Sequence, residues 1–415
     1  MKVNKKGAVA IAALIAGSML GLAGCSSSDS PKSDGDKPAA TTSGTLTVWV
    51  DADRARALKD VAAEFQKDKG IKVDLVVKDY GKIQQDFTAQ VPTGKGPDLT
   101  IGGHDWTGGF VKDGVVAPIE LGDKADQFEK VAVQAVTYDG KTYGLPYAIE
   151  NIAILRNTKL ADSTPSTWDE MITKGKAADT KYPFLVGLDP QAADPYHLYQ
   201  FQTSFGNSVF AQNADGSYDA SKLTIGDASG EEFAKWLGSQ GAKGTKIINL
   251  NLSGDLAKEA FLAGESPYYL TGPWNVADAQ AKGIDVSVDP IPSAGDETAA
   301  PFAGVQTFFL SAKSKNALAA TDFLVNYIAT EDVQTSLYEA GGRPPALTSA
   351  YEAAQSDPII AGFGKVGENA VPMPSIPQMG AVWDDWGKTE AAIIKGADPV
   401  SSWQKMASNI ESKLK

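Results

Sequence analysis

From residue 45 onward, apolar residues fall into short runs that follow strand and helix spacings in turn. Runs of four or more apolar residues indicate buried strands, whereas apolar residues three and four positions apart indicate helices. In the first part of the chain we expect three strands and two helices, at 46–50, 71–77 and 99–101 and at 54–69 and 83–91. The order strand, helix, strand, helix, strand predicts a parallel α/β unit with right-handed crossovers.

A second series of expected elements begins near residue 142. We expect strands at 142–146, 152–156, 268–270 and 286–288, and helices at 231–240, 255–263, 317–328 and 399–415. Thr167 and Glu170 have the spacing of a capping box, so another helix should begin there. A chain of 415 residues is too long for one core, and the two series together predict two α/β lobes.

The first 25 residues have the pattern of a targeting segment. Three lysines in the first six positions precede an uncharged apolar run at 7–22, and small residues lead to Cys25. This ending resembles the lipobox of bacterial lipoproteins, which implies a signal peptide over 1–24, cleavage before Cys25 and lipidation of that cysteine. The alternative is an ordinary secretory signal with a chance cysteine. Cys25 is the single cysteine of the chain, so no intrachain disulfide can form.

Residues 25–44 follow with Ser, Asp, Lys, Pro, Thr and Ala and without an apolar cluster. Such a composition cannot bury enough surface to fold, so we expect a flexible tether. The formal charge is −13, and removal of a signal with three lysines and no acid lowers it to −16. Because phosphate contacts need clustered Lys and Arg, this charge argues against nucleic acid as a partner.

Known catalytic and metal-binding motifs are absent from the sequence. It contains no G-x-S-x-G, H-E-x-x-H or P-loop, and its two histidines, His104 and His197, do not suffice for a His/Cys metal site. We therefore expect no metal, no cofactor and no enzymatic activity. Glycoside hydrolysis needs only two carboxylates, and Asp105 with Glu150 is the one pair that deserves testing for it.

Aromatic residues next to carboxylates recur in the predicted loops. The members of these groups are Trp49 with Asp51, Asp53 and Arg54; Asp105 with Trp106; Tyr147 with Glu150; Asp194 with Tyr196; Trp274; and Trp383 with Asp384. A pyranose presents apolar C–H faces to aromatic rings and a belt of hydroxyls to carboxylates and Arg. A single Trp next to an acid, as at Trp168, is more simply a core residue. The recurrence in loops of both halves favours a sugar site.

Several longer motifs carry a resemblance to a known family. They are the strand at 46–50, Gly96-Pro97-Asp98 with His104-Asp105, Asp139-Gly140-Lys141, Asp194-Pro195-Tyr196, Gly272-Pro273-Trp274, and Pro377-Gln378-Met379 with Trp383. From about Leu46 to its end, the chain resembles the extracellular solute-binding proteins of carbohydrate ABC importers. Within that family it is similar to the maltose/maltodextrin-binding proteins.

The resemblance implies an α/β, two-lobe periplasmic-binding-protein fold with hinge crossovers and a ligand cleft between the lobes. Carried over by position, the N-terminal lobe would comprise 45–148 plus 305–354 and the C-terminal lobe 151–301 plus 358–415. The crossings would fall near 148–152, 302–307 and 355–358. Closure of the two lobes on a sugar would be a population shift driven by the sugar's higher affinity for the closed form.

The resemblance also implies a site and partners. The ligand-binding residues would be Trp49, Asp51, Asp53, Arg54, Asp105, Trp106, Glu150, Asp194, Tyr196, Trp274 and Trp383. The ligand would be maltose or a malto-oligosaccharide, delivered to separate ABC permease subunits by a monomer held at the outer face of the cytoplasmic membrane through Cys25. The alternatives are the same role for trehalose, sucrose, a β-linked sugar or a pectin fragment, a sugar-active enzyme, and a sensor or adhesin.

Four positions depart from the maltodextrin-binding pattern. Gly102 stands where an aromatic residue is usual, Trp106 and Gly387 stand where Arg is common, and Asp194 replaces Glu. We hypothesise that Trp106 fills the space left by Gly102 and so keeps one aromatic platform. These departures bear on which sugar is bound and on its preferred chain length.

Overall fold

The computed structural model describes residues 44–213 and 218–414. The predicted signal peptide, Cys25 and all of the predicted tether except its last residue lie outside the described residues. Within the described part, no helix is both long enough and apolar enough to cross a membrane.

One sheet of seven strands organises the first lobe. Its main path runs in the order β15, β14, β3, β1, β2, and β4 and β7 also pair with β14. The strands are β1 (Thr45–Val50), β2 (Lys72–Val77), β3 (Leu99–Gly103), β4 (Val116–Ala117), β7 (Gly144–Glu150), β14 (Phe302–Ser311) and β15 (Val371–Pro372). β1 is parallel to β2 and β3, as predicted, whereas β14 is antiparallel to β3 and β7. The first sheet is therefore mixed, not purely parallel.

Helices and a small hairpin pack around this sheet. The helices are α1 (Ala52–Ala57), α2 (Lys59–Lys69), α3 (Tyr80–Gln90), α4 (Thr107–Lys112), α5 (Lys130–Ala135), α11 (Ala317–Asp322), α12 (Glu331–Gly341) and α13 (Thr348–Ala354). Helical turns are η1 (Val91–Thr93), η2 (His104–Trp106), η3 (Gly122–Gln127) and the π-helical η5 (Phe323–Ile328), and the hairpin pairs β5 (Thr137–Tyr138) with β6 (Lys141–Thr142).

A four-stranded sheet organises the second lobe, in the order β13, β8, β12, β9. Its strands are β8 (Ala153–Asn157), β9 (Leu185–Val186), β12 (Tyr268–Thr271) and β13 (Val286–Asp289), and a separate hairpin pairs β10 (Phe210–Gln212) with β11 (Tyr218–Leu223). β12 is parallel to β9 and antiparallel to β8. The loops after β9 and β12 therefore emerge at one edge of this sheet.

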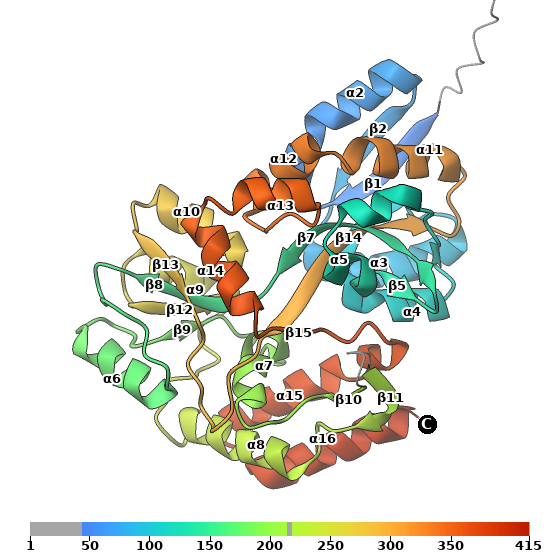
Figure 1. The fold of residues 1–415 in the computed structure, drawn as a ribbon. Coiled ribbons are helices and arrows are strands. Elements are labelled where there is room, and N and C mark those ends of the chain that lie inside the picture. Colours follow the sequence, from blue (N-terminus) through green and yellow to red (C-terminus); the bar gives the residue numbers. More distant parts are fainter. Residues whose placement is uncertain (1–43, 214–217, 415) are drawn as a thin grey trace, which may run out of the picture. The chain divides into compact units, whose positions relative to one another are not determined.

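The helices of the second lobe come from two separate stretches of sequence. They are α6 (Trp168–Ala177), α7 (Pro195–Thr203), α8 (Ala228–Gln240), α9 (Gly254–Leu262), α10 (Val276–Ala281), α14 (Pro358–Gly367), α15 (Trp383–Ile394) and α16 (Pro399–Leu414), with the turns η4 (Pro273–Asn275) and η6 (Pro377–Ala381). α8, α15 and α16 lie side by side although α8 is remote in sequence (Figure 1). The last segments of the chain thus complete the second lobe.

Two large apolar cores correspond to the two sheets. One core draws its buried residues from 152–302 and 359–410, and the other from 46–148 and 305–350. The chain therefore passes from one core to the other between residues 148 and 152, between 302 and 305, and between 350 and 359. β7 and β14 lie side by side at the first two of these passages (Figure 1).

The predictions of a capped helix start and of a buried helix face are confirmed, whereas two predicted helices differ in their continuity. The Thr167 hydroxyl accepts a hydrogen bond from the Glu170 N–H and caps α6, and the apolar face of α16 is buried. The helix expected over 54–69 is divided at Leu58 into α1 and α2, and the one expected over 317–328 changes to π-helix after Asp322. Periodicity alone does not detect such local changes of helical geometry.

Candidate functional site

Two adjoining cavities lie where the strand ends of the two sheets face each other. The outer cavity has a volume of about 790 Å³ and the inner cavity one of about 730 Å³. Both are lined by Tyr80, Asp194, His197, Trp274 and Arg343, so they form one continuous site. Binding at the carboxyl ends of sheet strands is the usual arrangement in α/β folds.

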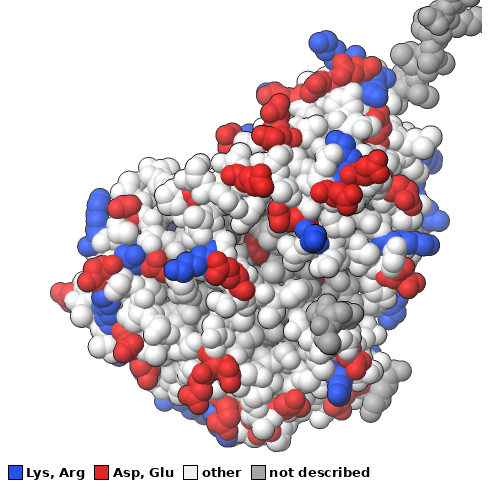
Figure 2. All heavy atoms as spheres, in the orientation of Figure 1, with Lys and Arg blue, Asp and Glu red and all other residues white. Residues whose placement is uncertain are grey.

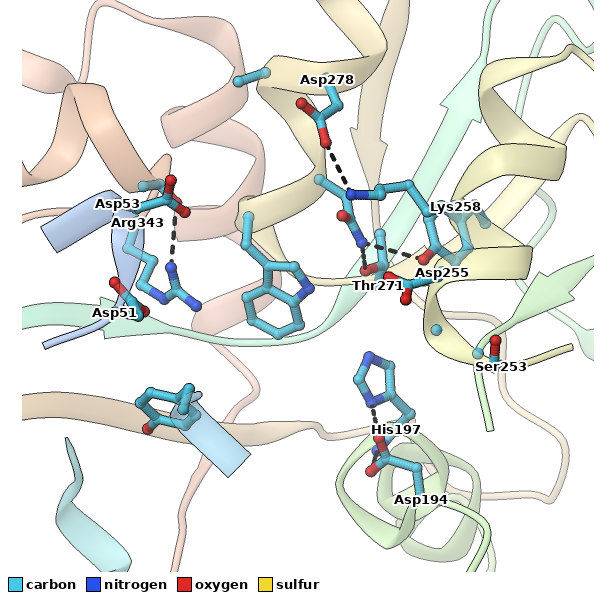
Figure 3. Close-up of a pocket in the computed structure, with 18 of the residues that line it drawn as sticks. Asp51, Asp53, Asp194, His197, Ser253, Asp255, Lys258, Thr271, Asp278 and Arg343 are labelled. Atoms are coloured by element: carbon cyan, nitrogen blue, oxygen red, sulfur yellow. Dashed lines mark hydrogen bonds and ion pairs between the residues drawn. The ribbon is translucent and has the colours of Figure 1, made fainter. Parts of the chain in front are cut away.

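The loop after β1 supplies charged groups to the outer cavity (Figure 3). Asp51 caps α1 by accepting from the Arg54 N–H at 2.9 Å, and its carboxylate also contacts the Arg54 guanidinium. Arg54 is buried, and its Nε donates to the Tyr147 hydroxyl at 2.8 Å. Its Nη2 has no hydrogen-bond partner among the described residues. A buried donor left unpaired is costly, so a ligand hydroxyl that reached it would be stabilised.

The loop after β3 supplies an aromatic platform to the inner cavity. A Cβ at Gly102 would lie 2.3 Å from two carbons of the Trp106 ring, so the indole occupies the space that a side chain at Gly102 would need. This geometry confirms that Trp106 fills the space left by Gly102. The Trp106 ring also packs against Tyr80, with 5.6 Å between the ring centres.

Asp105 is a half-buried carboxylate in the wall of the inner cavity. Burial raises the pKa of Asp105 to about 7, and the negative charge of Glu150 acts in the same direction, while contact with the Trp383 indole N–H acts against it. Burial also raises the pKa of Glu390, which lies near Asp194. No feature of the sequence indicated that either acid lies in a setting that raises its pKa.

Glu150 is held by groups from separate segments at the first crossing. Its Oε1 accepts from the Gln306 Nε2 at 2.8 Å, and its Oε2 accepts from the Arg343 Nε at 2.5 Å. The Tyr80 hydroxyl in turn donates to the Gln306 Oε1 at 2.8 Å. Because Gly304 on β14 has no side chain, Glu150 and the Tyr196 hydroxyl can both approach this strand.

The start of α7 brings a carboxylate and an imidazole into both cavities. Asp194 caps the helix by accepting from the His197 N–H at 3.1 Å, and Pro195 follows at the first helical position. The second carboxylate oxygen of Asp194 lies 2.6 Å from the His197 Nδ1. Figure 3 shows this pair at the wall opposite Arg343. Tyr196, between them in sequence, lines the inner cavity only.

Two tryptophans of the second lobe complete the aromatic walls. Trp274 follows β12 and lines both cavities, and its ring lies directly over Gly272, where a Cβ would be 2.1 Å from a ring carbon. Trp383 lies at the start of α15 and stacks on Trp386, with 5.5 Å between ring centres. The ring orientations are thus set by close backbone and aromatic packing.

Ten of the eleven predicted ligand-binding residues line the cavities. They are Asp51, Asp53, Arg54, Asp105, Trp106, Glu150, Asp194, Tyr196, Trp274 and Trp383. Trp49 is the exception: it is 5% exposed, packs edge-on against Phe87 and is covered by the Lys78 ammonium. We expected Trp49 to lie beneath a sugar, and the structure contradicts that expectation. The alternation of side chains along β1 turns the Trp49 ring away from the cavities.

Sequence reasoning missed most of the polar side chains along the outer cavity, and it also missed four residues that contact Trp106, Asp194 or Glu150. These four are Tyr80, His197, Gln306 and Arg343. Tyr80 and His197 carried a detectable signal, because each follows an Asp that caps the helix on which it lies. Gln306 and Arg343 carried none, because they reach the site only through the second crossing and the turn after α12.

Metal coordination finds no support in the described residues. Residues 44–213 and 218–414 contain no cluster of three His, Cys, Asp or Glu side chains that could hold a metal ion. His104 is buried; its Nδ1 accepts from the Val305 N–H, and its Nε2 therefore donates to the Met373 carbonyl. Burial lowers the pKa of His104 to about 4, so it is a neutral structural residue near pH 7.

Two α/β lobes with a continuous aromatic and polar site between their strand ends define a two-lobe binding protein of the periplasmic type. Residues 60–362 match the family model described as bacterial extracellular solute-binding protein, and the chain belongs to this family. Acidic and basic side chains are interspersed over the face seen in Figure 2, without a continuous basic area on that face.

Named relatives and a solved structure are similar over nearly the whole chain. The maltodextrin-binding protein MdxE of Bacillus subtilis (strain 168) is 28% identical over 97% of this chain and 96% of its own. The galactooligosaccharide-binding protein of the same organism is 27% identical over 100% of this chain and 99% of its own. The Thermus thermophilus maltotriose binding protein, solved with maltotriose bound, is 30% identical with a TM-score of 0.81, covering 89% of this chain and 100% of that one.

Proposed function

We propose that this protein binds maltodextrins in the cleft between its lobes and delivers them to an ABC importer. The observation that carries the proposal is the inner cavity, where Trp106, Tyr196, Trp274 and Trp383 surround the carboxylates of Asp105 and Glu150. Rings that cover pyranose faces and carboxylates that accept hydroxyl hydrogen bonds are the two demands of a sugar. The maltodextrin- and maltotriose-binding relatives support this sugar class.

We infer that capture proceeds by closure of the two lobes. The N-terminal lobe would comprise 45–148 plus 305–354 and the C-terminal lobe 151–301 plus 358–415, and the passages between the two cores support these bounds. Asp53, Arg54 and Asp105 would hold the sugar from one lobe, and Asp194, Tyr196 and Trp274 from the other. A sugar bridging both lobes favours the closed form by its higher affinity for that form.

We further propose that the protein acts as a monomer attached to the outer face of the cytoplasmic membrane. The lipobox-like ending at Cys25 supports lipidation there after removal of residues 1–24. Residues 25–44 would then tether the folded part close to separate permease subunits. Such a tether raises the effective concentration of the binder at its partner.

Two other functions are each favoured by one observation. A galacto-oligosaccharide ligand is favoured by the second relative, whose identity to this chain is nearly the same as that of the first. Glycoside hydrolysis is favoured by the raised pKa of Asp105, which is a property of general acids. Against hydrolysis, Glu150 accepts hydrogen bonds from Arg343 and Gln306 on both oxygens, which leaves a poor nucleophile or base.

Calorimetric titration of the chain from Ser26 onward tests these proposals together. The sugars would be maltose, maltotriose and longer maltodextrins, with galacto-oligosaccharide, trehalose, sucrose and cellobiose as comparators. We expect saturable one-to-one binding of the α-1,4 glucans, loss of that binding in Trp274→Ala, and recovery of the sugars unchanged. Tighter binding of galacto-oligosaccharide would overturn the maltodextrin assignment, and cleaved sugar would overturn the binding-only role.

A further inference from the structure

Glu390 on α15 is a buried acid to which the proposed sugar site assigns no role. Its side chain is 0% exposed, and neither carboxyl oxygen has a hydrogen-bond partner of regular geometry within residues 44–213 and 218–414. Buried carboxylates are normally paired or hydrogen-bonded, because an ionised group without partners is costly in an apolar interior. Buried acids that depart from this rule are found most often at functional sites.

Glu390 lies on the face of α15 that packs against the start of α7. Gly387 is three residues earlier and therefore on the same face of the helix. A Cβ at Gly387 would lie 2.3 Å from the Ala192 carbonyl oxygen and 3.3 Å from the Pro195 Cδ. The loop that makes this contact ends in Asp194, which lines both cavities and whose charge acts on Glu390. Glu390 is therefore next to the loop that carries a carboxylate of the site.

The loop at 189–194 is held together by its own hydrogen bonds. The Asp189 carboxylate accepts from two backbone N–H groups of the loop, at 2.7 and 2.8 Å. Asp189 and Ala193 exchange two backbone hydrogen bonds, and Ala193 has a φ of 44°, which is uncommon outside glycine. Asp194 then accepts from the His197 N–H at 3.1 Å. Because these contacts join the loop from end to end, a movement where it meets α15 also moves the Asp194 carboxylate.

A second path runs along α15 to an aromatic wall of the inner cavity. The ring of Trp386, one turn before Glu390, stacks on that of Trp383, with 5.5 Å between the ring centres. Trp383 lines the inner cavity, and the Trp386 indole N–H acts on the Glu390 carboxyl group. Glu390 is thus connected to one site residue through the loop before α7 and to another through the Trp386 ring.

The surroundings of Glu390 favour a protonated carboxyl group. Burial raises the pKa of Glu390 well above its ordinary value, the negative charge of Asp194 acts in the same direction, and the Trp386 indole N–H acts against both. A neutral carboxyl group leaves the Asp194 carboxylate unopposed in its capping position. An ionised Glu390 would repel Asp194 and would need water or a cation as a partner, so the loop would have to move off α15.

The other charged groups on the elements packed around Glu390 are engaged elsewhere. On α7, α8, α15 and α16 they form the pairs Asp194–His197, Glu231–Gln404, Glu232–Lys235, Asp384–Lys388 and Asp385–Lys413, and Lys405 and Glu411 are exposed. Of these groups, Asp194 is the one whose charge acts on Glu390. The protonation state of Glu390 is therefore coupled to the sugar site through Asp194.

We propose that Glu390 is a positioning residue of the sugar site. It keeps the loop at 189–194 and Asp194 in the arrangement that binds sugar only while its carboxyl group carries a proton. Sugar and proton then favour the same state of the loop, so each raises the affinity of the protein for the other. The sugar affinity is highest while Glu390 is protonated and falls as rising pH removes that proton. The inference rests on the proposed function, because it concerns the regulation of the same site.

The test is calorimetric titration with maltotriose from about pH 6 to about pH 10, on the wild type and on Glu390→Gln. The variant keeps the shape of the carboxyl group and cannot ionise. The ratio of the wild-type Kd to the variant Kd should rise about tenfold over this range, which is a usual size for such a coupling. Asp105 and the His197 imidazole are present in both proteins, so their own protonation cancels in the ratio.

Proton uptake on binding gives a second measurement, from titrations in two buffers of different ionisation enthalpy. At the alkaline end, maltotriose binding should take up more protons in the wild type than in Glu390→Gln. A residue with a packing role alone would change neither the Kd ratio with pH nor the proton uptake. Glu390→Leu, a second variant that cannot ionise, should lose the pH dependence in the same way.

Glu411→Gln is the matched control, because it removes an exposed acid of α16, and it should keep the wild-type pH profile. A Kd ratio that stays constant over the pH range, or equal proton uptake in wild type and variants, would overturn the inference alone, since maltotriose still binds. Failure of the wild type to bind maltotriose at any pH would overturn the proposed function itself.

Discussion

The guanidinium carbon of Arg343 lies 5.1 Å from the centre of the Trp274 ring, so that a cation from the first lobe covers an aromatic face of the second. The same side chain donates to Glu150 through its Nε at 2.5 Å. The neighbouring backbone is equally close, since a Cβ at Gly342 would lie 2.7 Å from the Pro273 carbonyl oxygen. Arg343 therefore joins the first crossing, the turn after α12 and the stacking platform at one point.

We expect Arg343→Ala to lower the free energy of unfolding by about 3 kcal/mol, because it leaves the buried carboxylate of Glu150 without its ion-pair partner. The Arg343→Met/Glu150→Gln double variant should recover much of that loss, since no charge remains unpaired. Urea denaturation of the single and double variants measures the coupling. Strictly additive losses would show that the two side chains do not act as a pair.

We expect Gly102→Ala to weaken sugar binding by about tenfold, because the new Cβ displaces the Trp106 ring that now lies over Gly102. Gly109→Ala is the matched control, since a Cβ at Gly109 has no atom within 4 Å. Titration of both variants with maltotriose gives the comparison. Unchanged affinity in Gly102→Ala would mean that Trp106 contributes nothing to sugar binding.

The contribution of Asp105 to stability should fall as the pH rises from about 4 to about 7, whereas that of His104, whose pKa is lowered to about 4, rises over much of the same range. Burial raises the folded-state pKa of Asp105 to about 7, whereas the unfolded chain releases this proton near its ordinary value of 3.8. Between these two pKa values the folded state holds a proton on Asp105 that the unfolded state has released. The stabilisation from Asp105 is therefore fully present below the unfolded-state pKa and is lost as the pH rises to the folded-state pKa.

Urea denaturation across this pH range, on the wild type and on Asp105→Asn, measures the contribution of this residue. The stability of the wild type minus that of the variant should decrease as the pH rises through this range, because Glu390 and His104 contribute equally to both proteins and cancel in the difference. Parallel profiles for the two proteins would contradict the assignment to Asp105.

We expect Gly387→Ala to destabilise the protein by about 1–3 kcal/mol, because a Cβ there would lie 2.3 Å from the Ala192 carbonyl oxygen. Gly380→Ala, where no atom lies within 4 Å, should change stability by no more than about 0.5 kcal/mol. Thermal or urea unfolding of the two variants and the wild type measures these changes in stability. Equal stabilities would show that α15 can move away from the loop before α7.

The sequence by itself determined the elements whose signals are local. The three parallel strands around Val48, the capping box at Thr167 and the apolar face of α16 depend on residues within one turn or one strand, and all were predicted. The loops after β1, β3, β9 and β12 were also found from their aromatic and polar residues. A buried core rarely contains acids and an ordinary surface rarely exposes large aromatic rings, so the two together indicate a binding site.

The tertiary structure alone decided which face of each element became the cleft. Trp49 is an aromatic residue next to acids, as a site residue would be. Side chains alternate along β1, however, so Trp49 packs against Phe87 on one face of the strand while Val48 and Val50 enter the core on the other face. β14 was missed as a strand because Gly304, Gln306 and Thr307 interrupt its apolar residues, so that it shows neither a long apolar run nor a regular alternation although almost every residue in it is buried.

Arg343 and Gln306 enter the site only because β14 and the turn after α12 pass beside Glu150. Contacts between segments so far apart depend on how two cores are joined, and local periodicity contains no information on that joining. Sequence therefore determined the chemistry available in the loops, and packing determined which of those loops share one cleft.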